Sequence, residues 1–506
     1  MTIAVSPLYG GHIIAPGSSN EVSSELIHVS FSKYPFSSMP AVPIMRGGSV
    51  MSLESVVSLN VAKFGGTSVA DYDAMQRCAD IIIANPQTRV VVVSASSGVT
   101  NQLVALTQAE TSVEESKALI KKIASIQYQI LDKLGNPSDV AARIDHILSH
   151  ISTLSERLKL TRSKAVMDEL LSQGEMCSSV FFAAVLREKG ASASAFDVRQ
   201  VLRTDSHHGR AEPQIEMIAE LAKQHLEPLL CDQVIVTQGF VGADSEGNTT
   251  TLGRGGSDYS AALLAEALQA DAVEIWTDVA GIYTTDPRLA PNARPIPEIS
   301  FNEAAEMATF GAKVLHPATI LPAVRQKIQV FVGSSWAPEQ GGTWIRHQVK
   351  SEPVYRAVAV RRDQTLLNLH SLQMLHAQGF LAETFATLAK HKISVDLITT
   401  SEVNVALTLD KTGSDSSGQG LLSEALLQEL SQHCRVRVEE GLALVAVIGN
   451  NIASTAGVCR RVFEVLETYN VRMICQGASP HNLCILVDEA EAANVIGALH
   501  ENLFEA

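Results

Sequence analysis

The stretch from Thr249 to Arg288 reads TTTLGRGGSDYSAALLAEALQADAVEIWTDVAGIYTTDPR. It begins with a polar loop broken by glycines. The loop ends at Ser257, a residue type favoured as a helix N-cap, with Asp258 in the first turn behind it. Apolar residues then recur at helical spacing, so we expect a helix over 258–269. Val273 to Trp276 is typical of a short buried strand, and a long polar loop leaves it.

The start of that helix is a candidate anion site, because free backbone N–H groups and the helix dipole favour negative charge there. Arg254 and Arg288 flank it. The same residues are also compatible with an ordinary capped helix beside a solvated arginine. A second glycine loop elsewhere in the chain, at Gly65 and Gly66, favours the anion site.

The composition limits the class of protein. A chain of 506 residues is too long for one core and predicts two or three domains. The net charge of −15 argues against a nucleic-acid or anionic-membrane partner. The seven cysteines form no CxxC pair, so we expect neither a zinc site nor a disulfide framework, and a reducing cytoplasm as the location. No run of about 20 apolar residues is present to span a membrane.

Residues 1–57 differ from the rest of the chain. They are rich in Ser, Pro and Gly, and their apolar periodicity is weak. No basic segment precedes an apolar core, which argues against a secretory signal. We expect a disordered N-terminal extension, or a start codon assigned too far upstream, since Met51 stands just before the first expected strand.

From Leu59 strands alternate with helices, which indicates an α/β domain with a mainly parallel sheet. We place this domain at residues 58–345. Ligands bind beyond the carboxyl ends of the strands in such sheets, and the polar loops lie there. The expected strands are 59–64, 90–93, 193–197, 234–240, 273–276 and 329–332.

Beyond Pro353 the elements become shorter and repeat. Two βαββαβ-like units are predicted, at 346–440 and 441–506. We expect separate strands at 435–439 and 442–448, one in each unit. The second unit lacks its last strand, and Val358 to Val360 could supply it, which would interlock the two units.

The familiar nucleotide fingerprints are missing, since the chain has no G-x-x-x-x-G-K-[ST] loop and no G-x-G-x-x-G after a strand. Lys63, at a strand end beside Gly65 and Gly66, suits phosphate instead, because the backbone can approach closely and the ammonium neutralises charge. A β-turn with a surface lysine is the alternative. Lys313 lies in a second glycine-containing apolar segment, and alone it is more often a snorkelling side chain.

Six motifs together resemble the aspartokinases, which have the amino-acid kinase fold. They are KFGGTS (63–68), SASSGVTN (94–101), QGE (173–175), TTTLGRGGSDYSA (249–261), WTDVAGIYTTDPR (276–288) and FGAKVLHP (310–317). The C-terminal region resembles paired ACT domains. Within it, HSLQMLHAQGFLAE (370–383) and ISVDLITTSEV (393–403) resemble the lysine-sensitive form. The resemblance covers about residues 58–505.

The resemblance implies transfer of the ATP γ-phosphoryl group to the side-chain carboxylate of aspartate, the first step towards lysine, threonine and methionine. That carboxylate is already ionised at neutral pH, so no base has to remove a proton. Catalysis then consists mainly of positioning and charge neutralisation. By resemblance Lys63 and Lys313 grip the phosphates, and Asp258 orients the two lysines.

The resemblance also implies the binding residues. Glu175 takes the α-ammonium of aspartate and Arg254 its α-carboxylate, a bidentate match. The remaining substrate-binding residues are Ser94, Thr100, Gly255, Gly256 and Ser257. The ATP-binding residues are Lys63, Gly65, Gly66, Thr277, Asp278, Tyr283, Arg288, Lys313 and Val314. Mg²⁺ is expected to arrive with ATP, and we assign no protein ligand to it.

Feedback inhibition by L-lysine is a further implication. The segment Met374 to Leu381 is expected to form a strand-to-helix turn with Gly379, whose amides and helix dipole suit the α-carboxylate of lysine, and Asp396 and Glu402 suit its ammonium groups. Acidic residues on a solvated sheet edge are the alternative. The full predicted set is Met374, His376, Gly379, Phe380, Leu381, Ser394, Val395, Asp396, Thr400, Ser401 and Glu402. We also expect a homodimer formed through the ACT units, or a tetramer.

Two other functions stay open. One is another carboxylate kinase of the same fold, for example one acting on acetylglutamate. The other is an ACT-type amino-acid sensor with an inactive kinase domain, which the intact Lys63, Arg254 and Asp258 argue against. No dehydrogenase module follows the second ACT unit in this sequence, so we expect a monofunctional kinase.

Overall fold

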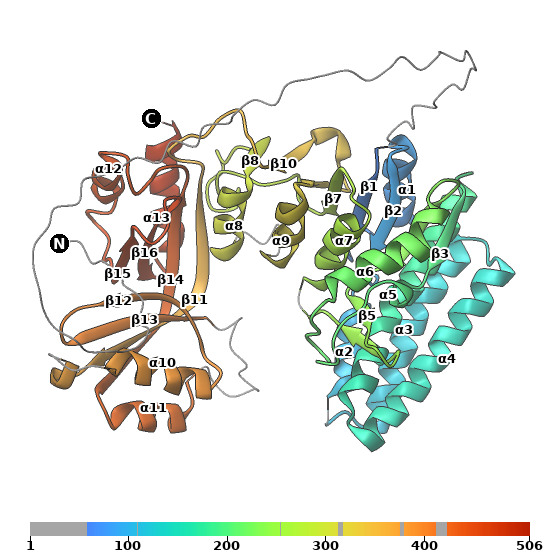
Figure 1. The fold of residues 1–506 in the computed structure, drawn as a ribbon, viewed down its shortest axis with the longest axis horizontal. Helices are drawn as coiled ribbons and strands as arrows, with labels where there is room; N and C mark the ends of the chain where they lie inside the picture. Colours follow the sequence, from blue (N-terminus) through green and yellow to red (C-terminus); the bar gives the residue numbers. More distant parts are fainter. Residues whose placement is uncertain are drawn as a thin grey trace, which may run out of the picture. The chain divides into compact units, whose positions relative to one another are not determined.

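The computed structural model describes residues 58–108, 110–253, 255–311, 317–374, 379–410 and 422–505. An eight-stranded sheet with its helices forms the N-terminal part, residues 58–346, and a six-stranded sheet with its helices forms the C-terminal part, residues 357–505 (Figure 1). Among the described helices none is long and apolar enough to cross a membrane.

The eight-stranded sheet is mainly parallel, as predicted. Its strand order is β3-β4-β2-β1-β7-β9-β10-β8, and β10 against β9 is the antiparallel pair among these neighbours. The strands are β1 (Asn60–Phe64), β2 (Thr88–Val93), β3 (Ala193–Phe196), β4 (Val234–Gln238), β7 (Ala272–Thr277), β8 (Glu298–Ser300), β9 (Gln329–Ser334) and β10 (Gly342–Arg346).

Helices cover both faces of this sheet, which explains why Val90 to Val93 are fully buried. One face carries α1 (Tyr72–Ala84), α2 (Val99–Thr107), α3 (Val113–Lys133), α4 (Ser138–Thr161) and α5 (Lys164–Glu188). The other carries α6 (Ile215–Leu221), α7 (Gly256–Ala267), α8 (Phe301–Thr309) and α9 (Pro317–Gln326).

Two details of the central stretch differ from prediction. The N-cap of α7 is Gly255 in the left-handed conformation (φ 71°), and Ser257 lies inside the first turn, so its predicted N-cap role is wrong. Glycine adopts this backbone without strain, whereas serine does not. The polar loop before α7 also contains a short antiparallel pair, β5 (Val241–Ala243) and β6 (Thr249–Thr251), which was not predicted.

The six-stranded sheet has the order β12-β13-β11-β14-β16-β15. Its strands are β11 (Ala357–His370), β12 (Ser394–Thr400), β13 (Asn404–Asp410), β14 (Arg435–Ile448), β15 (Met473–Gln476) and β16 (Asn482–Asp488). The separate strands predicted at 435–439 and 442–448 are wrong, because β14 is one strand of 14 residues. The pairing predicted for Val358 to Val360 is confirmed, since Val358 lies opposite Val447 and Val360 opposite Val445.

The helices of the C-terminal part form two separate cores on this sheet. Helices α10 (Phe380–Lys390) and α11 (Glu424–Ser431) pack on the half of the sheet that contains Leu367 and Leu407. Helices α12 (Val458–Val465) and α13 (Ala492–His500) pack on the half that contains Val445 and Ile485. Strands β11 and β14 run through both halves (Figure 1).

A buried carboxylate on α8 links the N-terminal and C-terminal parts. Glu303 is fully buried and accepts hydrogen bonds from Arg356 Nε at 2.7 Å and Asn450 Nδ2 at 2.6 Å. It also completes the capping box of α8 with Ser300. Because a buried charge is tolerated only with such partners, this contact favours a defined arrangement of α8 on the C-terminal part.

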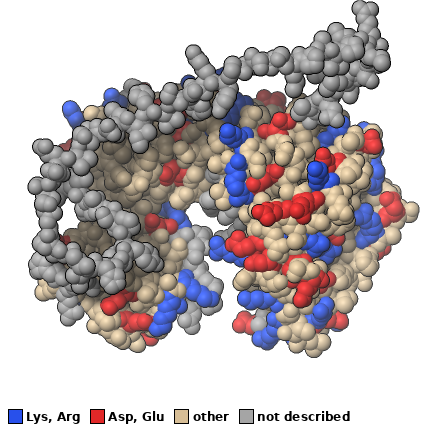
Figure 2. All heavy atoms as spheres, viewed as in Figure 1, with Lys and Arg blue, Asp and Glu red and all other residues tan. Residues whose placement is uncertain are grey.

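Charged side chains of both signs are interspersed on the face of the N-terminal part that Figure 2 shows. Among the exposed pairs of the N-terminal part, Lys133 Nζ lies 2.6 Å from Asp73 Oδ2. Pairs of this kind are worth only about 0–1 kcal/mol. This face therefore differs from the basic stripe that is typical of nucleic-acid-binding proteins.

Candidate active site

The centre of the candidate site is an ion pair between the two motifs that the sequence singled out. Lys63 lies near the end of β1 with 9% of its surface exposed, and its Nζ is 2.6 Å from Asp258 Oδ1 in the first turn of α7. The carboxyl end of a parallel strand thus meets the N-terminus of a helix, where anions bind favourably.

The glycine loop after β1 packs tightly against the loop after β2. The amide of Gly65 donates to the carbonyl of Trp276 at 3.2 Å. A Cβ at Gly66 would lie 2.9 Å from the Ala95 carbonyl oxygen, closer than real Cβ contacts, so glycine is required there. The chain after β4 also lies close to the start of α7, because a Cβ added at Gly239 would be 2.6 Å from the Cβ of Ser257. Several loops at the carboxyl end of the sheet therefore converge beside Lys63.

Glu175 approaches the same loops from helix α5. It is 5% exposed, and its Oε1 accepts a hydrogen bond from the Ala95 amide at 3.1 Å. Burial raises the pKa of this carboxyl to about 8, against the opposing effect of that hydrogen bond. A cationic group bound beside it would favour the ionised form, which is what an α-ammonium ligand supplies.

The other predicted substrate residues are placed less tightly. Ser94 is half-buried and its amide donates to the Phe64 carbonyl at 3.1 Å. Thr100 is exposed in the first turn of α2. Gly255 and Gly256 form the start of α7. The predicted residues outside the described part of the chain are Arg254, Lys313, Val314 and His376.

The predicted nucleotide residues follow β7. Thr277 ends this strand, and its hydroxyl donates to Asp278 Oδ1 at 3.1 Å. Tyr283 is half-buried and forms an isolated bridge with Pro295. The Arg288 side chain is 88% exposed and is paired with Asp286 at 2.6 Å. Asp278, Tyr283 and Arg288 lie on the loop that follows β7, and Asp278 and Arg288 are exposed.

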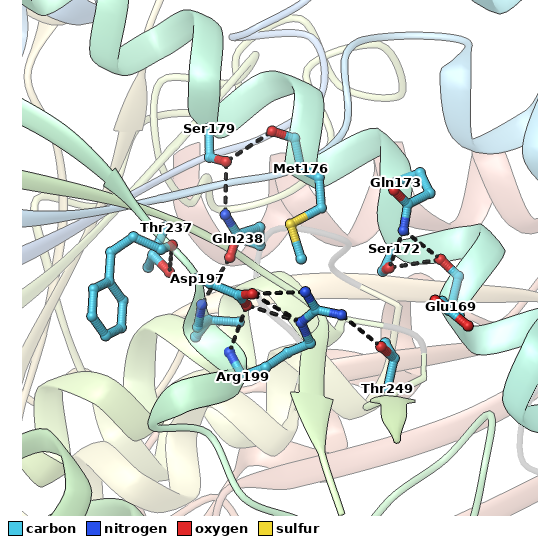
Figure 3. A network of polar contacts seen from close by, with 12 residues as sticks. Glu169, Ser172, Gln173, Met176, Ser179, Asp197, Arg199, Thr237, Gln238 and Thr249 are labelled. Atoms are coloured by element: carbon cyan, nitrogen blue, oxygen red, sulfur yellow. Dashed lines mark hydrogen bonds and ion pairs between the residues drawn. The ribbon is translucent and has the colours of Figure 1, made fainter. Parts of the chain in front are cut away.

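Strand β6 reveals residues that the sequence did not point to. Each of its three threonine hydroxyls is bonded by a different segment: Thr249 accepts from Arg199 Nη1 at 3.0 Å, Thr250 shares a hydrogen bond with Thr204 at 2.7 Å, and Thr251 donates to Asp168 Oδ1 at 2.9 Å. Figure 3 shows Arg199 between Asp197 and Thr249. Strand β6 ends shortly before α7 begins in the sequence. These bonds therefore help to position the first turn of α7, which contains Asp258.

Asp168 is the most buried charged member of this network, at 1% exposure. It accepts from the amides of Thr251 and Gly209 at 3.1 and 2.9 Å and contacts His208 Nδ1 at 3.2 Å. Burial raises the pKa of Asp168, and the Gly209 amide, the Thr251 hydroxyl and His208 only partly offset this rise. Asp168 precedes Glu175 by seven residues on α5, so both lie on one helix face. That spacing is the signal by which the sequence could have identified it.

The described residues of the predicted lysine site lie on α10, on β12 and in the segments next to these two elements. Gly379, in the left-handed conformation (φ 97°), starts α10, whose first turn contains Phe380 and Leu381. Ser394, Val395, Asp396 and Thr400 lie on β12, an edge strand, and Ser401 and Glu402 are exposed after it. Met374 ends a short 3₁₀ turn. Asp396 accepts a hydrogen bond from Arg361 Nη1 at 3.0 Å, a partner that was not predicted.

Comparison with known proteins agrees with this architecture. The model of the amino acid kinase family matches residues 58–334, and an ACT domain model matches residues 445–503. Lysine-sensitive aspartokinase 3 of Escherichia coli (strain K12) is 58% identical over 445 residues, which cover 88% of this chain and 99% of that protein. The chain belongs to the aspartokinase family.

Solved structures of the aspartokinase family have the same fold. Escherichia coli aspartokinase III in complex with aspartate and ADP, described as the R-state, matches with a TM-score of 0.81 at 57% identity, covering 88% of this chain and all of that chain. The lysine and aspartate complex, described as the T-state, matches with a TM-score of 0.77 at 56% identity, covering 88% and 99%. The family and the fold class inferred from the sequence motifs are thus confirmed.

Proposed function

We propose that this protein is an aspartate kinase that transfers the γ-phosphoryl group of ATP to the side-chain carboxylate of L-aspartate, giving 4-phospho-L-aspartate, and that L-lysine inhibits it. The observation that carries the proposal is the ion pair of Lys63 with Asp258 at 2.6 Å, where a glycine loop meets a helix N-terminus. The family relationship supports the choice of aspartate and lysine as ligands.

The residues around this pair suit a reaction between two anions. The aspartate side chain is ionised at neutral pH and attacks without help from a base. The ammonium of Lys63 neutralises charge on the transferring group, and Asp258 holds that ammonium in place. Lys313 is assigned the second cationic position. Catalysis is then positioning and electrostatic stabilisation.

Aspartate is held at both of its charged ends in this proposal. Glu175, buried beside the Ala95 amide, takes the α-ammonium group. Arg254 takes the α-carboxylate, for which a guanidinium offers a bidentate fit. The groups that line the rest of the pocket are Ser94, Thr100, Gly255, Gly256 and Ser257.

The nucleotide occupies the loops that follow β1 and β7. The Gly65 and Gly66 loop lies beside the Lys63 ammonium, a combination that suits phosphate oxygens. Mg²⁺ arrives with ATP and, when bound, neutralises phosphate charge. The residues assigned to the rest of the nucleotide are Thr277, Asp278, Tyr283, Arg288 and Val314.

We also propose that the protein forms a homodimer through its C-terminal part and that it is located in the cytoplasm. Leu381 and Phe385 are four residues apart on α10 and are 40% and 39% exposed, and Ile398 on the edge strand β12 is 37% exposed. Apolar side chains exposed on one helix face and a neighbouring strand edge favour burial against a second copy.

Aspartate-dependent release of ADP from ATP, measured with and without lysine, tests the function. The expected result is turnover that requires aspartate, that falls when lysine is added and that is lost in Lys63→Ala. N-acetylglutamate in place of aspartate serves as the control acceptor. Turnover with N-acetylglutamate alone would identify another carboxylate kinase, and no turnover with either acceptor would identify a sensor without kinase activity.

A further inference from the structure

The loop after β7 is attached to the last helix of the C-terminal part. Thr284, next to Tyr283, contacts His500 Nε2 through its hydroxyl at 2.8 Å. His500 ends α13 and is fully buried. Its other ring nitrogen, Nδ1, lies 3.1 Å from Glu505 Oε1, and the ring stacks on Phe504 with centroids 5.0 Å apart. The imidazole is therefore held on both edges and on one face.

The partners of these groups determine the direction of the hydrogen bonds. Glu505 as a carboxylate can only accept, so Nδ1 of a neutral His500 donates to it and Nε2 is left as an acceptor. Because Nε2 in this tautomer can only accept, the Thr284 hydroxyl donates its proton to it, while the Thr284 oxygen accepts from the Arg294 amide at 2.9 Å. The result is a chain of donors from Arg294 through Thr284 and His500 to Glu505 in which each polar group is satisfied.

Further contacts attach the same loop to the C-terminal part. The Val358 amide at the start of β11 donates to the Thr284 carbonyl at 2.7 Å. Leu289 packs against the core formed by α12 and α13. Asn292 Nδ2 donates to Glu505 Oε2 at 3.1 Å. Residues 284–292 therefore depend for their position on β11, α13 and the residues that follow α13.

We infer that His500 is a positioning residue for nucleotide binding: through Thr284 it holds the loop that presents Asp278, Tyr283 and Arg288 to ATP. The C-terminal part thereby contributes to the nucleotide side of the active site. This inference rests on the proposed function, which assigns those three residues to ATP. His500 itself does not need to touch the nucleotide, because His500 acts through the hydroxyl of Thr284.

The physical reason is the cost of leaving a buried polar group without its partner. Thr284→Val keeps the shape of the side chain but removes the hydroxyl, which leaves both His500 Nε2 and the Arg294 amide without it. His500→Ala removes the ring and opens a space beside Phe504. In both variants the loop has fewer constraints, so ATP must order it on binding, and affinity falls.

The experiment measures KM for ATP, KM for aspartate and ADP affinity by calorimetry in Thr284→Val, His500→Ala and the double variant. We expect KM for ATP and the ADP dissociation constant to rise about tenfold, the change that about 1.4 kcal/mol produces. KM for aspartate stays within about twofold. The double variant should resemble the single ones, because both remove the same contact.

Conservative variants that keep a hydrogen-bonding group at either position test whether ATP affinity can be restored. Thr284→Ser keeps the hydroxyl, and His500→Gln offers an amide oxygen near the position of Nε2, so both should recover most of the ATP affinity. His150→Ala is the matched control, because His150 pairs with Glu169 at 3.0 Å inside the N-terminal part and should leave KM for ATP unchanged.

The outcomes separate the inference from the proposed function. If Asp278→Ala and Tyr283→Ala also leave KM for ATP unchanged, the assigned nucleotide site is wrong. If those two raise KM for ATP while Thr284→Val and His500→Ala do not, the site stands and the role of His500 is refuted. An equal rise of both KM values, or no recovery in Thr284→Ser, would show general damage to the fold and would also refute it.

Discussion

Strand β6, which leads to the residues assigned to aspartate, is held by Asp168, Arg199 and Thr204, all from the N-terminal part. The loop assigned to ATP is held instead by His500 and Val358 of the C-terminal part. The aspartate side is thus fixed within one part of the molecule, and the nucleotide side depends on both. In our proposal, a change in the C-terminal part therefore reaches the loop assigned to ATP without first disturbing the residues assigned to aspartate.

The largest effect is expected at the ion pair that the two sides share. Lys63→Ala and Asp258→Ala should each lower kcat by about 10²- to 10³-fold, the usual result of removing one preorganised electrostatic group. Thermal melting should change little, because the pair lies at the end of a strand rather than in the core. Near-normal kcat in both variants, with unchanged melting, would remove the basis for the proposed site.

The next effect concerns lysine, which in our proposal acts on the C-terminal part. Glu402→Ala should weaken lysine inhibition by about 10- to 150-fold, since a charge-assisted hydrogen bond is worth about 1.5–3 kcal/mol. Uninhibited kcat should be almost intact, because Glu402 is exposed beyond β12. Lysine titrations at saturating aspartate and ATP provide the measurement.

Asp396→Ala is the companion variant, and its result separates two roles. In the structure Asp396 is paired with Arg361 at 3.0 Å, so this variant also disturbs a contact between β12 and β11. Arg361→Ala disturbs the same contact while keeping the carboxylate. Identical inhibition curves for wild type, Glu402→Ala and Asp396→Ala would place the effector elsewhere.

Asp168→Asn is the counterpart of the His500 variants on the aspartate side. An amide cannot accept all the donors that now surround the buried carboxylate, and a buried donor left without its partner costs about 1–3 kcal/mol. We expect KM for aspartate to rise about tenfold while KM for ATP stays nearly constant.

Glu274→Gln is the matched control for Asp168→Asn. Glu274 is also a buried carboxylate with several donors, Asn60, Asn85 and Trp276, but it lies on β7 away from β6. It should affect thermal stability and leave KM for aspartate near wild type. An equal change of KM for aspartate and KM for ATP in Asp168→Asn would mean that the two sides are not held separately.

A smaller effect is the pH dependence of aspartate binding. Burial raises the pKa of Glu175 to about 8, so below this pH the carboxyl must lose a proton before it can pair with an α-ammonium. KM for aspartate should therefore fall as the pH rises from 6 through 8 and level off about one unit above the pKa. Glu175→Gln should raise KM and flatten the profile. A profile that is unchanged in Glu175→Gln would assign the titration to another group.

The same shift has a consequence for folding. Because the pKa of Glu175 in the folded protein lies above that of an unfolded glutamate, the folded state binds the proton more tightly. The stabilising contribution of Glu175 to the free energy of unfolding is fully present at a pH below the pKa of this glutamate in the unfolded chain. It is lost as the pH rises to the folded-state pKa of about 8. Denaturant titrations of wild type and Glu175→Gln at pH 5 and pH 8 would measure it.

Long periodic elements and loops with distinctive composition were predictable from the sequence. The run Val90 to Val93 indicated a strand buried on both faces, and the residues around Lys63 and Asp258 indicated an anion site, because these signals are local. Strands β8, β10 and the β5–β6 pair were missed, since strands of three to five residues show no clear periodicity. Separate strands were predicted at 435–439 and 442–448, but Gly441, with a left-handed backbone (φ 71°), lies inside the continuous strand β14.

The contacts that hold the two sides of the site were not predictable in the same way. Asp168 and Thr251 are 83 residues apart, and Thr284 and His500 are 216 residues apart. Asp, Thr and His are all common on protein surfaces, so none of these four residues suggests its partner by itself. Only the fold brings them together, which is why the sequence indicated candidate ligand-binding residues but not the contacts that hold the segments around them.

The smallest expected effect comes from residues 1–50. They precede the first described strand, lie outside the span matched by the amino acid kinase family, and show no periodic apolar face that would need to be buried. Deleting them should leave kcat, both KM values and the melting temperature essentially unchanged, because segments of this composition are usually dispensable for the folded domain. A change confined to KM for ATP would mean that the segment acts on the loop held by His500. A change confined to KM for aspartate would mean that it acts on β6. A lower melting temperature alone would mean that it packs on the folded protein.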